Sequence, residues 1–184
     1  MIRKLSKEDF LTTYGPLHES IFKNSSQPDF PFVSKDWEVA LLPYGELEFA
    51  DVDFFALMQS SLEMADNELI ITVFETSPPH QDNVVISWDK ETLTQVRNSF
   101  FGNFCCHLFG RSGTWGVASY WDDSFWVGGS NKFMELFTRK AGGRFSLKER
   151  FLDFARTQWR LPKDLQKVVL STVGWRNKAE IKRD

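Results

Sequence analysis

The sequence predicts a single α+β domain, with a central, mostly antiparallel sheet of about four to six strands and helices at both ends of the chain. The length of 184 residues fits one domain, and a hydrophobic fraction of 42% can fill one core. Strand-like apolar runs collect in the middle of the chain, whereas apolar residues at helical spacing collect at its two ends. Because these patterns do not alternate regularly, a parallel sheet of βαβ units is not expected.

The N-terminal part predicts helix and then loop. Apolar residues recur at helical spacing from Phe10 to Phe22, after a capping box that begins at Ser6. Gly15-Pro16 interrupts this pattern, so we expect a kink or two short helices. The segment 24–35 is expected to be loop.

A short hairpin is expected over residues 37–49, with its turn at Pro43-Tyr44-Gly45. Residues 51–65 return to helical spacing, and either Asp51 or Asp53 can provide the N-cap.

The middle of the chain predicts most of the sheet. A continuous apolar run indicates a buried strand at 69–74. A helix capped by Asp89 is expected over about 90–101. The turn 122–124 is short, so its flanking strands should be antiparallel neighbours. The remaining strands are expected at residues 84–88, 104–109, 115–121 and 125–127.

The last part of the chain predicts three helices. The first follows Gly128-Gly129-Ser130 and carries Phe133 and Phe137. The second is expected to begin at the capping box Ser146-Leu147-Lys148-Glu149. The third has Pro162 in its first turn and ends at Gly174.

The formal net charge of −3 is a cancellation between two parts of the chain. Residues 1–138 hold 9 basic and 20 acidic side chains, a net of −11, and residues 139–184 hold 13 basic and 5 acidic ones, a net of +8. We therefore expect the basic helical segment 139–184 to dock on the acidic body, in the same molecule or in a second copy. Nucleic acid is a poor partner for a body of this charge.

The sequence shows no pattern typical of secretion or of membrane insertion. No N-terminal apolar run resembles a signal peptide, and no window is long enough to span a membrane. The two cysteines, Cys105 and Cys106, are adjacent and cannot build a disulfide framework. We expect a cytoplasmic protein that does not bind a membrane.

No motif identifies a reaction, and we expect no catalytic residue, cofactor or metal. Cys105 and His107 would share one face of a strand, but they lie in a core-like segment with no orienting third group. The histidines, His18, His80 and His107, are far apart and lack ligand spacing.

Two acidic or glycine-rich features have ordinary structural explanations. Asp122-Asp123 is typical of a turn. The loops 110–113 and 128–132 resemble parts of a phosphate-binding loop, yet neither matches a complete pattern, and a tight turn with positive φ would equally require the glycines.

One segment resembles a known family. The pattern Trp115-Gly116-Val117-Ala118-Ser119, Asp122-Asp123, Trp126-Val127-Gly128-Gly129, and then Phe133 and Phe137 covers about 23 residues. It is similar to the signature of small bacterial immunity proteins, in which a Trp-Gly strand, a hairpin and a Gly-Gly turn precede a helix. The resemblance implies structural roles for Trp115, Gly116, Gly128 and Gly129, and a non-catalytic protein that binds and blocks a toxin.

Our leading hypothesis is a protein-binding domain that inhibits a toxin, in which an acidic surface faces a basic partner. The residues expected to contact the partner are Trp121, Asp122 and Asp123. The first alternative is a small enzyme or ligand-binding domain with a pocket among the Trp-rich strands. The second is a scaffold or oligomerisation domain that binds a copy of itself.

Overall fold

The computed structural model describes residues 2–23, 30–43, 51–73, 83–88, 106–120 and 124–174. Within these ranges the chain forms one sheet and helices on both sides of it, which confirms the α+β class. All neighbouring strands are antiparallel. The seven described strands, in order across the sheet, are β1 (Ile2–Leu5), β4 (Asn83–Ser87), β3 (Glu68–Val73), β5 (Cys106–Gly110), β6 (Trp115–Tyr120), β7 (Ser124–Gly129) and β2 (Glu38–Pro43).

The strand that the sequence did not predict is β1, at one edge of the sheet. Its two central side chains, Arg3 and Lys4, are charged and exposed. Charged side chains are common on edge strands because they discourage further pairing, and they hide the alternation that identifies a strand.

The predicted hairpin over 37–49 is only partly described. Its first arm exists as β2, but this strand pairs with β7, so that Leu41 lies opposite Trp126. The second arm of the predicted hairpin lies outside the described residues, as does the helix expected over 90–101. The predicted neighbours around 122–124 do pair, as β6 and β7.

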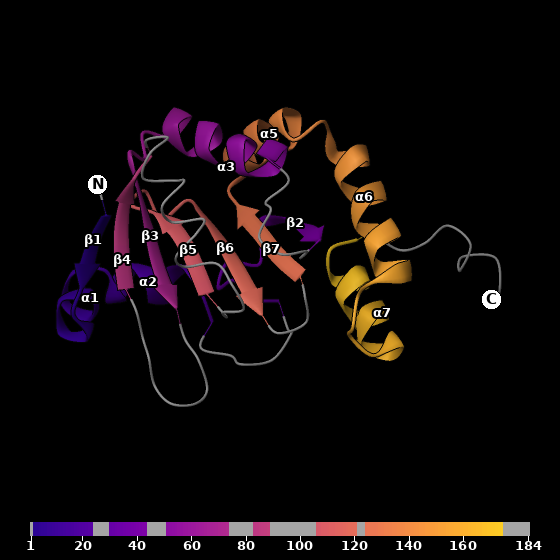
Figure 1. Cartoon of the computed structure of the whole chain (residues 1–184), viewed down its shortest axis with the longest axis horizontal. Helices are drawn as coiled ribbons and strands as arrows, with labels where there is room; N and C mark the ends of the chain where they lie inside the picture. The colour runs from indigo at the N-terminus through magenta and orange to yellow at the C-terminus, as the bar shows by residue number, and fades with distance from the viewer. Residues whose placement is uncertain are drawn as a thin grey trace.

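Six helices are described, and their arrangement is shown in Figure 1. The chain forms two short N-terminal helices that are divided at Gly15-Pro16, which confirms the second of the two alternatives expected there. In Figure 1, α3 and α5 lie together at the top, and α6 and α7 at the right. The helices are α1 (Lys7–Thr13), α2 (Gly15–Ile21), α3 (Asp51–Glu63), α5 (Asn131–Lys140), α6 (Arg144–Thr157) and α7 (Lys163–Thr172).

One predicted helix start is wrong. Helix α6 begins at Arg144, so Ser146 lies inside it and is not its N-cap. Gly142 and Gly143 adopt φ of 91° and 97°, and this left-handed pair reverses the chain sharply enough for the helix to begin earlier. The helix predicted over 51–65 is observed as α3, and of its two candidate caps Asp53 is excluded because it lies in the first turn.

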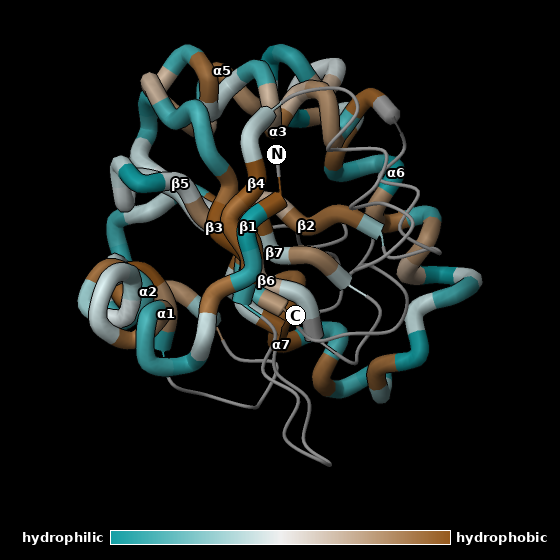
Figure 2. Tube along the Cα trace, turned by 60° about the vertical axis from the view of Figure 1, so that its left-hand side comes forward, coloured by the Kyte–Doolittle hydropathy of each residue, from teal (hydrophilic) through white to brown (hydrophobic). Residues whose placement is uncertain are grey.

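The sheet is covered on both faces. Phe22, at the end of α2, packs against one face, where a Cβ on Gly116 would come within 2.6 Å of its ring. Phe133 of α5 packs against the other face, where a Cβ on Gly129 would come within 2.7 Å. We call these the α1–α2 face and the α3–α5 face. Figure 2 shows α1 and α2 together on one side of the sheet and α6 on the other.

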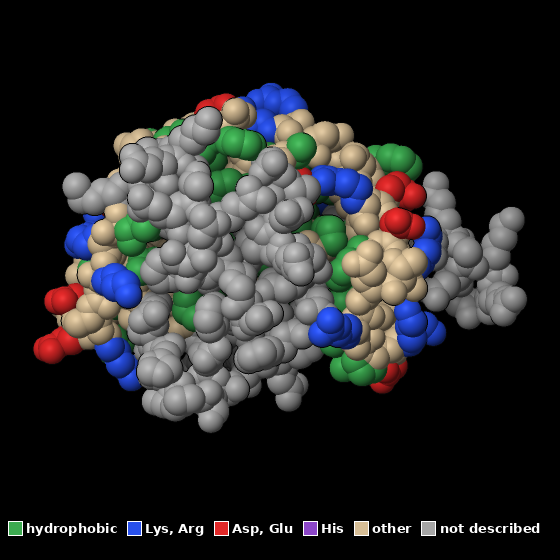
Figure 3. Space-filling model, viewed as in Figure 1, with side chains coloured by type: hydrophobic (Ala, Val, Ile, Leu, Met, Phe, Trp, Pro, Cys, Tyr) green, Lys and Arg blue, Asp and Glu red, His purple; other side chains and the backbone are tan. Residues whose placement is uncertain are grey.

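Helix α6 of the basic segment contacts the acidic part of the chain. Helix α6 packs along β2, and its Arg144 pairs with Glu38 at 3.1 Å. Arg150 makes a bidentate pair with the buried carboxylate of Asp53 in α3, at 2.7 and 3.0 Å. In Figure 3, Lys and Arg side chains lie at the right of the view, over α6 and α7. Helix α6 is therefore joined to the body by both packing and charge.

Candidate functional site

The four residues that the family resemblance marks as structural are packing positions. Trp115 is fully buried and stacks on Phe133 at 5.2 Å between ring centroids. Gly116, Gly128 and Gly129 lie where the rings of Phe22, Phe32 and Phe133 approach the sheet, so a side chain at any of them would collide. None of these three glycines has positive φ. Glycine is required because an aromatic ring approaches the backbone closely, and the positive φ expected for a turn at 128–132 is not observed.

The α1–α2 face carries a pair of histidines in contact, which the sequence did not predict. His18 Nε2 and His107 Nδ1 are 2.8 Å apart, and the ring of Phe22 stacks on His107 at 4.0 Å. Burial lowers the pKa of His18 to about 4. Burial, and then the neighbouring His18, lower the pKa of His107 to well below its usual range. Both rings are therefore neutral at pH 7, and the pair packs as part of the core.

Next to His107 on the same face lies a short row of buried polar side chains. Thr72 lies opposite His107 in β5 and opposite Asn83 in β4. Thr72 and Asn83 are 2% and 1% exposed, yet within the described chain the Thr72 hydroxyl and the Asn83 amide find no hydrogen-bond partner. An unpaired buried polar group costs about 1–3 kcal/mol, so this row is unlike the rest of the core.

At one end of the strands, a buried carboxylate fixes the turn between β5 and β6. Asp66 accepts hydrogen bonds from the Ser112 backbone N–H at 2.8 Å, the Ser112 hydroxyl at 2.7 Å and the Trp115 indole N–H at 2.7 Å. Ala65, just before it, has φ of 64°, which turns the chain after α3 toward the sheet. A side chain at Gly110 would overlap the Asp66 carboxylate, so glycine is required there.

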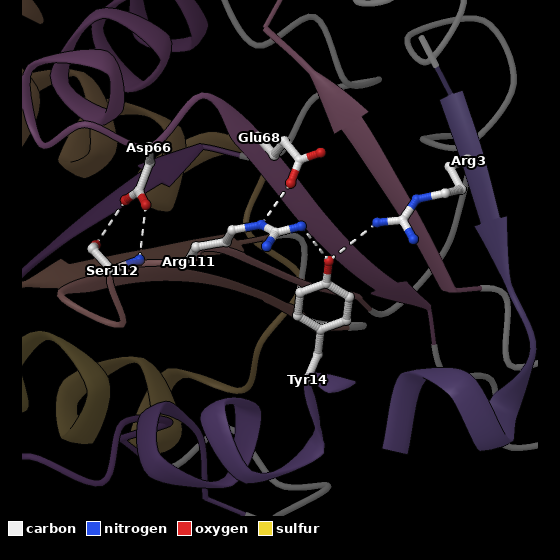
Figure 4. A network of polar contacts seen from close by, with 6 residues as sticks. All are labelled: Arg3, Tyr14, Asp66, Glu68, Arg111 and Ser112. Carbon is white, nitrogen blue, oxygen red and sulfur yellow. Dashed lines mark hydrogen bonds and ion pairs between the residues drawn. The ribbon is translucent and has the colours of Figure 1, made fainter. Parts of the chain in front are cut away.

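This turn presents Arg111 to a network that Figure 4 shows from close by. Arg111 Nε donates to Glu68 at 2.6 Å, and Arg111 Nη2 donates to the Tyr14 hydroxyl at 2.9 Å. Arg3, from β1, donates to the same hydroxyl oxygen at 3.2 Å. Two guanidinium groups from distant parts of the sequence therefore meet at one phenol.

Helix α3 exposes apolar side chains along its outer side. Val52, Phe55 and Leu62 are 54%, 47% and 41% exposed. Their spacing of three and seven residues places them on one face of the helix, and we call them the α3 stripe. The opposite side of α3 is buried at Leu57 and Ser60. Figure 3 shows hydrophobic side chains reaching the surface over α3 at the top of the view.

The other predicted site residues lie outside the described residues. They are the expected contact residues Trp121, Asp122 and Asp123, and also Cys105. In the ranges that the structure describes, no group of three or more His, Cys, Asp and Glu side chains could hold a metal ion. No helix of those ranges is both long and apolar enough to cross a membrane.

Sequence reasoning missed the Arg3–Tyr14–Arg111 network and the α3 stripe for different reasons. The network joins residues separated by up to 108 positions, and no local spacing reveals such a contact. The stripe could have been predicted from the sequence, because apolar residues occur on all sides of the helix 51–63. A helix with this pattern is expected to be covered on all sides.

Comparison with known protein families, with curated proteins and with solved structures finds no match for this chain.

Proposed function

We propose that this chain is a protein-binding domain whose partner docks on the α3 stripe, and that it acts as an immunity-type inhibitor of a toxin. The observation that carries the proposal is the stripe itself. A helix that needs only to cover a sheet exposes polar side chains, whereas α3 buries Leu57 and also exposes large apolar side chains on its outer side. Exposed apolar surface of this kind is typical of interaction sites.

The neighbouring helix shows that an apolar outer side is not needed to cover the sheet. On α5 the buried side chains include Phe133 and Phe137, while the exposed ones are polar or charged, such as Lys132 and Glu135. Both helices cover the same face, and only α3 leaves large apolar groups in water. The difference favours a role for the α3 stripe in binding.

Charged side chains border the stripe. Glu63, at the end of α3, pairs with Lys140 of α5 at 2.6 Å and is about half exposed. The hydrogen bond from Lys140 lowers the pKa of Glu63 below its usual value, so the carboxylate stays ionised at neutral pH. An apolar centre with a charged rim is the usual anatomy of a protein interface.

The immunity role rests on the resemblance of residues 115–137 and on the net charge of −11 over residues 1–138. A negatively charged inhibitor would attract a basic toxin and speed its association. That Trp121, Asp122 and Asp123 contact the toxin stays a prediction.

A second candidate function is the binding of a small molecule under the α1–α2 face. The unpaired hydroxyl of Thr72 and the unpaired amide of Asn83 favour it, because a bound polar ligand would supply their missing hydrogen bonds. Substitutions in the α3 stripe would abolish binding only in the first candidate function, and substitutions of Thr72 or Asn83 only in the second.

The test is a growth assay in which the chain is co-expressed with the product of the neighbouring gene. We expect the wild-type chain to rescue growth and the double variant Phe55→Glu, Leu62→Glu to lose rescue, because binding would bury two unpaired carboxylates. The matched control is Leu11→Glu, which changes an apolar residue that is 50% exposed on α1.

Rescue by the double variant at the wild-type level would contradict the proposal, provided that circular dichroism shows all variants folded. So would a wild-type chain that self-associates through the stripe and loses this association in the double variant. That second outcome would favour the oligomerisation alternative.

A further inference from the structure

The Arg3–Tyr14–Arg111 network lies apart from the α3 stripe, on the other face of the sheet. Arg3 comes from edge strand β1, Tyr14 from the junction of α1 and α2, and Arg111 from the β5–β6 turn. Figure 4 shows the two guanidinium groups approaching the Tyr14 hydroxyl from opposite sides. Tyr14 is 3% exposed, whereas the side chain of Arg111 is about half exposed, so the network reaches the surface.

Hydrogen-bond donors outnumber acceptors in this network. The Tyr14 oxygen accepts from Arg3 and from Arg111, and these two bonds use its lone pairs. The hydroxyl proton then has to be donated elsewhere, but no acceptor for it lies within hydrogen-bond distance in the described chain. Two guanidinium groups and one O–H thus converge, and all can donate to a further group.

The charge of the network is also incomplete. Arg111 pairs with Glu68, whose carboxylate binds the Nε side of the guanidinium. Arg3 has no carboxylate partner among the described residues. Asp66, the other carboxylate shown in Figure 4, already accepts from Ser112 and Trp115. Within the described ranges, no carboxylate therefore balances the charge that Arg3 brings to Tyr14.

The groups are held in place before any ligand arrives. Asp66 fixes the turn that carries Arg111, and Glu68 fixes the guanidinium itself. Arg111 also lies over the Tyr14 ring, at 5.5 Å from the ring centroid. A site with immobilised donors loses less conformational entropy when a ligand binds.

From this arrangement we infer that Arg3, Arg111 and Tyr14 bind an oxyanion, the carboxylate or phosphate group of a ligand. The planar fork of arginine matches both groups, and bonds between ionised partners are the strongest hydrogen bonds in proteins. An oxyanion accepts from all three donors and neutralises the remaining charge, which a neutral ligand or a cation cannot do. The inference does not depend on the proposed function.

Thermal unfolding and NMR titration with sodium phosphate, sodium sulfate and sodium acetate test it, with sodium chloride at equal ionic strength as the reference. We expect saturable shifts of the Arg111 side-chain Nε–H resonance and a higher Tm than in chloride. Saturation by phosphate and sulfate alone would identify a tetrahedral group, and saturation by acetate would identify a carboxylate. Each of these outcomes supports the site.

Three variants separate binding from folding. Arg3→Gln changes an exposed residue of an edge strand and should weaken oxyanion binding at least tenfold without unfolding the protein. Tyr14→Phe should weaken it severalfold. The matched control is Arg156→Gln, an exposed arginine of α6 with only a loose pair to Asp153 at 3.8 Å, and it should bind as the wild type does.

Two results would overturn the inference. One is that none of the three anions shifts the Arg111 resonance beyond the effect of chloride. The other is that Arg3→Gln lowers Tm equally in phosphate and in chloride while the affinity for phosphate stays unchanged. The arginines would then serve only to hold β1, α2 and the β5–β6 turn together.

Discussion

The two faces of the sheet distribute polarity in opposite ways. Under α1 and α2, polar and titratable groups point inward, namely His18, His107, Thr72 and Asn83. The outer side of these helices is mainly charged or polar, as at Glu8 and Glu19. Under α3 and α5 the described buried strand residues are apolar apart from Ser119, and it is the outer side of α3 that is apolar.

This contrast distinguishes side chains that stabilise the fold from side chains whose presence the fold does not explain. The α3–α5 face gains its stability from a close-packed interior, so folding does not require the exposed apolar residues of the α3 stripe. The α1–α2 face contains buried polar groups that weaken a core, so folding does not explain its histidines and unpaired side chains. Substitutions on either face of the sheet test this comparison.

The largest effect is expected from the two sides of α3. Leu57→Ala, at a fully buried residue, should lower the free energy of unfolding by about 2–5 kcal/mol because it leaves a cavity. Leu62→Ala, in the α3 stripe, should change it by about 0.5 kcal/mol or less. Urea denaturation measures both. Equal losses would mean that the stripe belongs to the core, and the comparison would fail.

The next effect concerns the ion pair that joins α3 to α6. Asp53→Asn should lower the free energy of unfolding by roughly 1–3 kcal/mol, since it leaves Arg150 beside a neutral amide in a partly buried position. Asp153→Asn is the control, because that carboxylate is 80% exposed and exposed pairs contribute little. Similar results for both variants in thermal unfolding would show that the pair does not anchor the basic helices.

The histidine pair predicts a pH dependence specific to the α1–α2 face. The pKa of His18 is about 4 in the folded protein and about 6.5 in the unfolded chain, so below pH 6.5 the unfolded state binds more protons. Stability should therefore be constant above pH 6.5 and fall as the pH drops toward 4, by roughly 1–2 kcal/mol between pH 7 and pH 5 after discounting for partial exposure. Urea unfolding at both values tests this. His18→Gln should reduce the slope, and an unchanged slope would show that other groups cause it.

The smallest effect is expected at the unpaired hydroxyl of Thr72. Thr72→Val keeps the shape and removes a buried group without a partner, so stability should stay constant or rise by up to about 1 kcal/mol. Ser60→Ala in α3 is the comparison, because the Ser60 hydroxyl donates to the Ala56 carbonyl at 2.7 Å. A clear loss of stability in Thr72→Val would indicate a hydrogen bond to ordered water or to a ligand.

Local patterns in the sequence predicted most of the described fold. The division at Gly15-Pro16, the buried strand β3 and the neighbours β6 and β7 follow from periodicity and turn chemistry within short windows. The pairing of β2 with β7 and the meeting of His18 with His107 could not be predicted, because contacts between distant segments depend on how the whole sheet assembles. The roles of Gly116 and Gly129 were expected from the resemblance, but their physical cause became visible only with the aromatic rings above them.

The central claim is that the α3 stripe is the surface on which a protein partner docks. Its most direct test is the affinity of the chain for the product of the neighbouring gene, measured by calorimetry for the wild type, Phe55→Glu and Leu11→Glu. We predict that Phe55→Glu binds at least a hundredfold more weakly, while Leu11→Glu binds as the wild type does. Equal affinities for all three would contradict the claim.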